Sequence, residues 1–297
     1  MPRLAGLVLL LATLPLPLPS QQPDGRVQSV LANGYRFAYV ESGSGRPVVL
    51  VHGALGDYRS WDSVAKASGS SAHLIAYSRR YHAPNPWRPD DPPAGYETSA
   101  ADLAAIVRAL RLDRPVLVGY SWGGGVVLQV ALRYPDLVGG LVLAEPVVDS
   151  MIEDPLARAR TAARTRAAYA RALAEDHGPP AESAVRSLVE TWRGAGAWDR
   201  LPPEERERLL ENAPSVRSSA APQPAVTCAA VGRLAIPVLL VGGASSPSRF
   251  QSTLAGLAHC LRAAERVAIP SAGHDFPLTH AAAFRDALAR WLDALPH

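Results

Sequence analysis

The sequence predicts an α/β fold: a mostly parallel sheet flanked by helices, with a helical cap inserted between two of its strands. Three observations lead to this prediction. Short apolar runs alternate with helical patterns, the runs are apolar at successive positions, and the strand pattern stops between residues 146 and 230. Uninterrupted apolar runs are typical of parallel strands buried on both faces. Alternation on both sides of a helical insert predicts a capped parallel sheet.

The composition of the 297-residue chain suits one sizeable globular domain with an inserted subdomain, since 48% of its residues are hydrophobic and 19% are charged. The formal net charge is a modest +3. Lys66 is the single lysine, and the arginines are scattered along the chain without forming a basic run. We therefore expect no nucleic-acid partner.

The N-terminus has the pattern of a secretory signal peptide. Arg3 precedes an apolar stretch over residues 4–14, and a Pro/Leu segment then leads to a polar exit at residues 20–24. The apolar stretch is too short to span a bilayer comfortably, although Leu18 and Ser20 form a weak cleavage site. We expect a signal peptide over residues 1–20, a secreted or periplasmic protein, and no stable membrane span after cleavage. An uncleaved anchor is the alternative.

In the first half of the chain, apolar runs predict strands and periodic segments predict helices. Ser99 with Asp102 has the spacing of a helix start, and apolar residues follow at helical spacing up to Leu110. A second helix is predicted over residues 123–132. The predicted strands cover residues 35–40, 47–51, 74–77, 115–118 and 141–144.

The cap is expected over residues 146–230, between a first part of the core at 26–145 and a second part at 231–297. Its sequence is rich in Ala, Arg and Glu, and Gly/Pro segments separate its helical stretches. The predicted cap helices cover residues 155–174, 181–192 and 203–211. The alternation then resumes with strands at 237–241 and 266–269 and helices at 250–261 and 281–292.

Cys228 and Cys260 are the only cysteines. An oxidising compartment permits a disulfide between them, but spacing alone cannot show that their Cα atoms come close enough, and two small buried side chains are an equal alternative. No Cys-x-x-Cys or His-Glu-x-x-His spacing occurs. We expect neither a metal nor a cofactor.

The strongest chemical signal is Gly119-Tyr120-Ser121-Trp122-Gly123, which lies directly after a predicted strand and directly before a predicted helix. A nucleophilic serine needs its hydroxyl exposed at the end of the sheet, on a tight turn that small flanking residues allow. Because the pattern stands in this strand–helix context, we interpret Ser121 as the nucleophile.

Two further motifs supply the other parts of acyl-transfer chemistry. His52-Gly53-Ala54 ends an earlier strand, so the backbone N–H groups of Ala54 and Trp122 are the expected oxyanion hole. His52 itself is interpreted as a residue that holds the loop. His274, in Gly273-His274 after the last predicted strand, is the expected general base, since an imidazole titrates near neutrality.

These motifs together resemble those of α/β-hydrolases of the capped kind, over nearly everything from Gly34 to the last helix. His52-Gly53, the Ser121 motif and Gly273-His274 occur in the family's order. The segments 53–61 and 77–82 are also similar to the family. The resemblance implies a mostly parallel sheet of the α/β-hydrolase type, with a helical cap inserted after the sixth strand.

The triad acid departs from the commonest family pattern, which places an aspartate after the strand equivalent to residues 237–241. Residues 242–247 contain no carboxylate, yet the histidine needs one to orient its ring. The best candidate is Glu145, directly after the strand at 141–144, and Asp149 is the second choice. Some of the similar haloalkane dehalogenases and coelenterazine luciferases carry their acid at this place.

A serine nucleophile implies an acyl-enzyme, whereas the related epoxide hydrolases and haloalkane dehalogenases use an aspartate there. The predicted function is hydrolysis of a carboxylic ester or similar acyl substrate, a small molecule. Carbon–carbon bond hydrolysis and a cofactor-free perhydrolase or haloperoxidase-like activity use the same triad and remain open. A non-catalytic ligand receptor is the alternative from another class. The oligomeric state is not encoded in any motif we recognise.

Overall fold

Eight strands form one sheet in the computed structural model, which describes residues 26–65, 72–174, 182–261 and 263–296. The strand order is β1-β2-β4-β3-β5-β6-β7-β8. β1 and β4 each pair with β2 in antiparallel fashion, and every other pair is parallel. The strands are β1 (Gln28–Ala32), β2 (Tyr35–Ser42), β3 (Arg46–Val51), β4 (Ala72–Tyr77), β5 (Val116–Tyr120), β6 (Gly140–Ala144), β7 (Val238–Gly243) and β8 (Glu265–Ile269).

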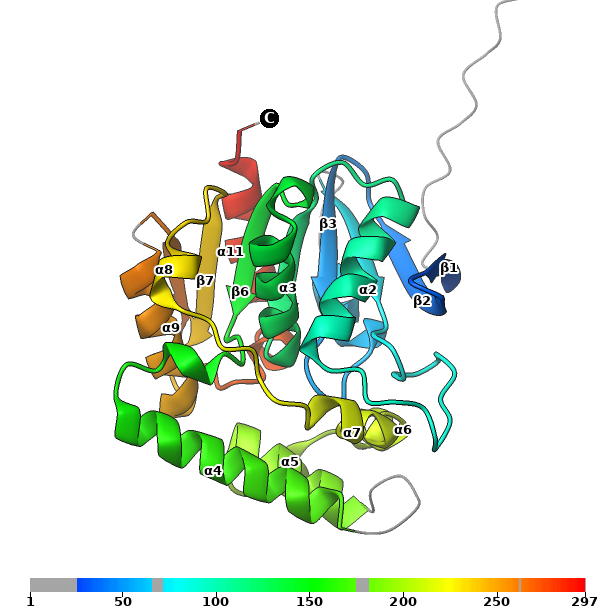
Figure 1. Ribbon diagram of the computed structural model, residues 1–297, viewed down its shortest axis with the longest axis vertical. Helices are drawn as coiled ribbons and strands as arrows, with labels where there is room; N and C mark the ends of the chain where they lie inside the picture. The colour runs from blue at the N-terminus through cyan, green and yellow to red at the C-terminus, as the bar shows by residue number, and fades with distance from the viewer. Residues whose placement is uncertain (1–25, 66–71, 175–181, 262, 297) are drawn as a thin grey trace, which may run out of the picture.

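Helices cover both faces of this sheet, which explains the uninterrupted apolar runs in the sequence. In β3, Val49 and Val51 belong to one apolar core while Val48 and Leu50 belong to the other, because successive side chains point to opposite faces. Figure 1 shows α2, α3 and α9 on the near face of the sheet, with α11 behind it. The mostly parallel α/β sheet predicted from the sequence is therefore confirmed.

The helices follow the strands in the expected alternation, and most predicted elements lie within a few residues of the observed ones. The longer core helices are α2 (Tyr96–Ala109), α3 (Trp122–Arg133), α9 (Ser248–Cys260) and α11 (Ala281–Asp293). The helices between β6 and β7 are α4 (Pro155–Ala172), α5 (Glu182–Arg193), α6 (Pro203–Glu211), α7 (Val216–Ser219) and α8 (Cys228–Val231). Short helices α1 (Asp62–Ala65) and α10 (Phe276–Thr279) complete the core.

One sequence-based prediction about a single element was wrong, and one strand was not predicted. The helix expected to begin at Ser99 begins at Tyr96 with Gly95 as its N-cap, and Asp102 does not cap it. The Asp102 carboxylate instead accepts hydrogen bonds from Arg80, at 2.7 and 2.9 Å. Strand β1 was missed, because it is a short edge strand in which only Val30 and Ala32 are buried.

Helices α4 to α7 lie across the edge of the sheet where the parallel strands end (Figure 1). They have an apolar core of their own, which includes Tyr169, Leu188 and Trp198, and Leu55 from the loop after β3 packs into it. The buried Asp57 accepts a hydrogen bond at 2.8 Å from Asn212 and so links this helical segment to the core. The domain boundaries at residues 146 and 230 stay a prediction.

Cys228 and Cys260 form a disulfide, which settles the alternative that the sequence left open. Because Cys228 begins α8 and Cys260 ends α9, the bond fastens the last short helix before β7 to the helix after it. The predicted signal peptide, residues 1–20, lies outside the described residues. Within the described ranges, no helix combines the length and apolar character needed to cross a membrane.

Candidate active site

Ser121 occupies a strained turn between β5 and α3. Its backbone has φ 53° and ψ −118°, a conformation that costs an L-residue about 1–3 kcal/mol and is typical of functional sites. A side chain at Gly123 would lie 2.3 Å from the Val51 carbonyl oxygen, so α3 can approach the end of β3 only with glycine at this position. The turn therefore holds the Ser121 hydroxyl at the carboxyl end of the sheet.

His274 lies beside this hydroxyl, with its Nε2 atom 3.0 Å from Ser121 Oγ. Its ring stacks on Phe250 with centroids 3.6 Å apart, and its carbonyl oxygen accepts a hydrogen bond from the Tyr120 hydroxyl at 2.8 Å. These contacts fix the orientation of the ring. The loop that carries His274 follows β8, so the serine and the histidine come from strands that are not neighbours.

Glu145 completes this chain of contacts from the end of β6. Its Oε2 atom lies 2.6 Å from His274 Nδ1, and its Oε1 atom accepts the Gly243 N–H at 2.7 Å. Because a carboxylate only accepts, Nδ1 carries the ring proton and donates it, which leaves Nε2 free to accept the Ser121 hydroxyl proton. The side chain of Glu145 is fully buried.

The reserve candidate for the acid, Asp149, does not contact the histidine. It accepts two hydrogen bonds from Arg249, at 2.9 and 3.1 Å, and a third from Gln223 at 2.8 Å. The structure thus brings Ser121, His274 and Glu145 together and leaves Asp149 in an ion pair elsewhere in the site.

The loop after β3 lies directly against the Ser121 turn. A Cβ atom at Gly53 would come within 3.1 Å of Ser121 Cβ, a tight contact that glycine avoids. The Gly53 carbonyl oxygen lies 3.1 Å from Arg79 Nη2 and 2.8 Å from His52 Nδ1. Two donors therefore hold the peptide unit whose N–H belongs to Ala54.

His52 is a buried structural residue, as the sequence indicated. Its Nε2 atom accepts the Arg79 N–H at 2.9 Å, so the ring proton lies on Nδ1 and is donated to the Gly53 carbonyl. Burial, with help from the Arg79 charge, lowers the pKa of His52 to about 3. The ring is neutral at physiological pH and holds the loop without taking protons from a substrate.

Trp122 is the first residue of α3, so its N–H has no carbonyl partner one turn earlier in the helix. Its indole nitrogen donates to the Ser219 carbonyl at 3.1 Å, and its ring stacks on Tyr96 with centroids 3.9 Å apart. The side chain is thereby fixed while the backbone N–H stays beside Ser121. Ala54, Ser121 and Trp122 all line the same cavity.

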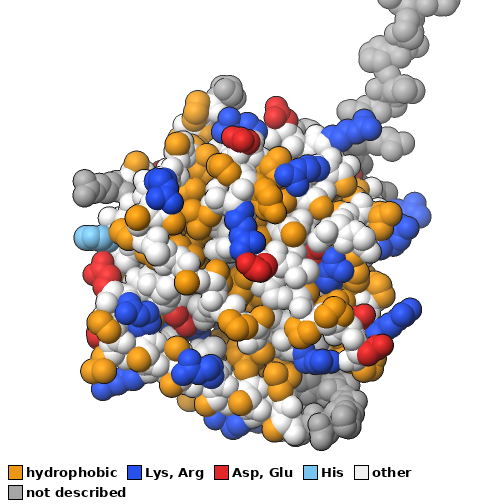
Figure 2. Space-filling model, in the orientation of Figure 1, with side chains coloured by type: hydrophobic (Ala, Val, Ile, Leu, Met, Phe, Trp, Pro, Cys, Tyr) orange, Lys and Arg blue, Asp and Glu red, His pale blue; other side chains and the backbone are white. Residues whose placement is uncertain are grey.

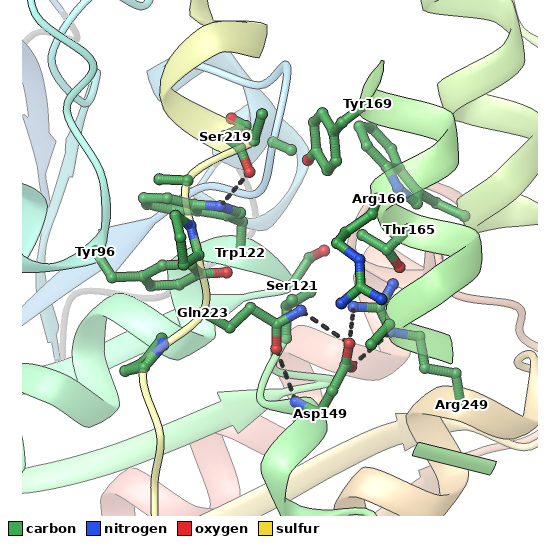
Figure 3. Close-up of a pocket in the computed structure, with 18 of the residues that line it drawn as sticks. Tyr96, Ser121, Trp122, Asp149, Thr165, Arg166, Tyr169, Ser219, Gln223 and Arg249 are labelled. Carbon is green, nitrogen blue, oxygen red and sulfur yellow. Dashed lines mark hydrogen bonds and ion pairs between the residues drawn. The ribbon is translucent and has the colours of Figure 1, made fainter. Parts of the chain in front are cut away.

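This cavity of about 820 Å³ lies between the core and the helical segment. Figure 3 shows Ser121 at its base, with Tyr96 and Trp122 on one side and Thr165, Arg166 and Tyr169 of α4 on the other. Of the cap aromatics considered from the sequence, Tyr169 and Trp192 line the cavity, whereas Trp198 is buried in the core of the helical segment. The cavity can hold a small organic substrate.

Several residues that shape the site were not predicted from the sequence. Phe250 and Tyr120 hold the histidine, and Arg79 holds the loop after β3. Arg79 falls in the segment 77–82, which resembled the family, but nothing in its spacing revealed a buried cation. Within the described part of the chain, no group of three or more metal-ligating side chains of the His, Cys, Asp and Glu types is found.

A family model and several known proteins are similar to this chain. A family model described as the alpha/beta hydrolase fold matches residues 46–281. A 2-hydroxy-6-oxo-2,4-heptadienoate hydrolase of Pseudomonas putida is 30% identical over 200 residues, which cover 54% of this chain and 71% of that enzyme. A soluble epoxide hydrolase of a Corynebacterium species is 32% identical over 119 residues, which cover 39% of this chain and 40% of that enzyme.

Among solved structures, an esterase from Thermogutta terrifontis superimposes with a TM-score of 0.74 at 21% sequence identity. The match covers 91% of this chain and 99% of the esterase. At this identity the likeness concerns the fold.

The His274 ring is expected to stay neutral at mildly acidic pH, because burial lowers its pKa below the ordinary value of 6.5 although Glu145 acts to raise it. An NMR titration of the His274 Cε1 proton, assigned with His274→Ala, should have its midpoint below pH 6.5. In Glu145→Gln the midpoint should move lower still, since the contribution that raises the pKa is removed. A midpoint above 6.5 in the wild type would contradict the burial argument.

Proposed function

The chain belongs to the α/β-hydrolase family, and from this premise we propose that it is a serine hydrolase that cleaves a carboxylic ester or a similar acyl substrate. The observation that carries the proposal is the continuous chain of contacts from Ser121 Oγ through the His274 ring to the Glu145 carboxylate, with steps of 3.0 and 2.6 Å. Nucleophile, base and orienting acid within hydrogen-bond distance are the parts that acyl transfer requires.

In the proposed reaction, Ser121 Oγ attacks the substrate carbonyl carbon while His274 Nε2 takes the hydroxyl proton. The tetrahedral intermediate then collapses, the bond to the alcohol breaks, and Nε2 gives its proton to the leaving oxygen. Water, deprotonated by His274, attacks the resulting acyl-serine ester, and the proton returns to Ser121 as the carboxylic acid leaves. Glu145 stabilises the imidazolium that forms in both halves.

The backbone N–H groups of Ala54 and Trp122 are proposed to bind the oxyanion. Support comes from the start of α3, which leaves the Trp122 N–H without a helical partner and adds the positive end of the helix dipole. The Ala54 N–H belongs to a peptide unit whose carbonyl accepts bonds from both His52 and Arg79. Such preorganised donors are a large source of rate enhancement in acyl transfer.

Export to a secreted or periplasmic location is part of the proposal. It is supported by the signal-peptide pattern over residues 1–20 and by the disulfide between Cys228 and Cys260, since such bonds persist in oxidising compartments.

Hydrolysis of a carbon–carbon bond is the second candidate function, favoured by the 30% identity to the heptadienoate hydrolase. The same serine, histidine and carboxylate would serve it. Turnover of a 2-hydroxy-6-oxo-dienoate, compared with that of nitrophenyl esters of graded chain length, distinguishes the two candidates.

A fluorophosphonate should label the folded protein at Ser121, because the neighbouring imidazole activates this hydroxyl. Mass spectrometry of the peptides identifies the modified residue. Labelling should disappear in Ser121→Ala and fall sharply in His274→Ala. An intact wild-type protein that is not labelled would instead favour a ligand receptor on this fold.

Glu145→Gln should lower kcat for ester hydrolysis by about 10³- to 10⁴-fold, because an amide in place of the carboxylate can favour the wrong imidazole tautomer and cannot stabilise the imidazolium. Asp149→Asn is the matched control: it changes the charge of a carboxylate on the same connection that contacts Arg249 and not the histidine. Its effect on kcat should stay below about tenfold. Equal, small effects in both variants would remove Glu145 from the proposed triad.

Arg79→Met should lower kcat by about ten- to a hundredfold with little change in KM, because the Gly53–Ala54 peptide loses a charged hydrogen bond that holds its N–H in place. Arg79→Lys keeps the charge and should recover part of the loss. Thermal unfolding of each variant separates this effect from misfolding. A folded Arg79→Met protein with unchanged kcat would show that the loop is held without this contact.

A further inference from the structure

The cavity above Ser121 carries more positive than negative charge. Its lining includes Arg158, Arg166 and Arg249, and among the described residues that line it Asp149 is the one acidic residue. Arg249 and Asp149 are joined by two hydrogen bonds, so their charges offset each other. The charges of the other two arginines, Arg158 and Arg166, are not offset by Asp149 in this way.

Arg158 and Arg166 have no carboxylate partner within the described ranges. Arg158 donates to the Ile152 carbonyl at 2.7 Å, a contact that leaves its charge uncompensated. Arg166 makes no hydrogen bond or ion pair with another described residue, and its side chain extends from α4 toward the space above Ser121 (Figure 3). Helix α4 itself supplies no negative charge, because its 18 residues include five arginines and no Asp or Glu.

Several basic side chains are visible on the face of the molecule where α4 lies (Figure 2). Most of them are in solvent, where salt screens a charge within about 10 Å. Arg158 is half-buried and Arg166 is exposed, but both line the cavity, whose other walls are largely apolar, such as Trp122, Tyr169 and Phe250. Charges beside low-dielectric walls act more strongly on a bound ligand.

A third unpaired cation lies behind the cavity wall. The Arg79 guanidinium is 4.1 Å from the centroid of the Trp122 ring, its side chain is buried, and its only hydrogen bond to another described residue is the one to the Gly53 carbonyl. No described carboxylate contacts it. Positive charge therefore lies on two sides of the cavity: on α4 and beneath Trp122.

We infer that the substrates of this site carry a carboxylate in addition to the acyl bond that is cleaved, and that Arg166 binds this carboxylate. The inference rests on the proposed serine-hydrolase function and narrows its substrate class. A guanidinium is the side chain best suited to bind a carboxylate through two parallel hydrogen bonds. Arg158, held by the Ile152 carbonyl, adds attraction at a fixed position, while Arg166 is free to close on the ligand.

The experiment compares matched esters that differ in one carboxylate. Mono-4-nitrophenyl glutarate and 4-nitrophenyl pentanoate have acyl chains of the same length, and 4-acetoxybenzoate and phenyl acetate place the difference on the alcohol side. The measured quantity is the ratio of kcat/KM within each pair, divided by the same ratio in Arg166→Gln. Intrinsic differences in reactivity between the esters cancel in this quotient.

In at least one pair, Arg166→Gln should reduce the relative kcat/KM for the charged ester by about tenfold or more, mainly through KM, with little change for the neutral ester. Arg166→Lys should keep part of the preference. Raising the NaCl concentration from 20 to 500 mM should weaken it in the wild type. The control is Arg164→Gln, since Arg164 is an exposed arginine of the same helix that does not line the cavity.

Different results would overturn the carboxylate inference and the serine-hydrolase proposal. If Arg166→Gln and Arg164→Gln leave both ratios unchanged while the neutral esters are hydrolysed through Ser121, the carboxylate inference is overturned and the serine-hydrolase proposal stands. If no ester is hydrolysed and no fluorophosphonate labels Ser121, the proposed function itself fails.

Discussion

The arrangement of this site depends on the carboxylate of Glu145, which is fully buried and must be satisfied by hydrogen bonds. A buried charge is tolerated only when hydrogen bonds satisfy it, and here the two oxygens are bound by the Gly243 N–H and the His274 ring. Gly243 ends β7, His274 lies in the loop after β8, and Glu145 directly follows β6. One buried side chain thus ties three strand ends together and sets which nitrogen of the imidazole faces Ser121.

The position of this carboxylate follows from the order of the strands in the sheet. The carboxyl ends of β6 and β7 lie side by side, so a side chain that follows either strand can reach the same imidazole. After β7 the chain contributes a backbone N–H from Gly243 in place of a carboxylate. A Cβ atom at Gly242 would collide with Leu254 and approach Glu145. Glycine at this position therefore leaves room for the glutamate side chain.

Two arginines, Arg79 and Arg166, place positive charge at different depths of the site. Arg79 is buried beneath Trp122 and holds the loop that follows β3, where it acts on the peptide of Ala54. Arg166 lies on α4 and faces the cavity from the opposite side. Burial lowers the pKa of Arg79 to about 10, which still leaves the guanidinium charged at neutral pH. The reacting bond and the remainder of a substrate would therefore meet separate cations.

The sequence by itself determined the order of strands and helices and singled out Ser121 and His274, because these depend on local signals: apolar runs, glycines around a serine, and a histidine after the last strand. Tertiary structure alone decided that Glu145 and not Asp149 contacts the imidazole, since both follow the same strand and only the fold shows which side chain reaches the ring. It also joined Cys228 to Cys260 and left Arg158 and Arg166 without a carboxylate partner among the described residues. Such properties depend on distances between segments far apart in the chain, and a local pattern contains no information about those distances.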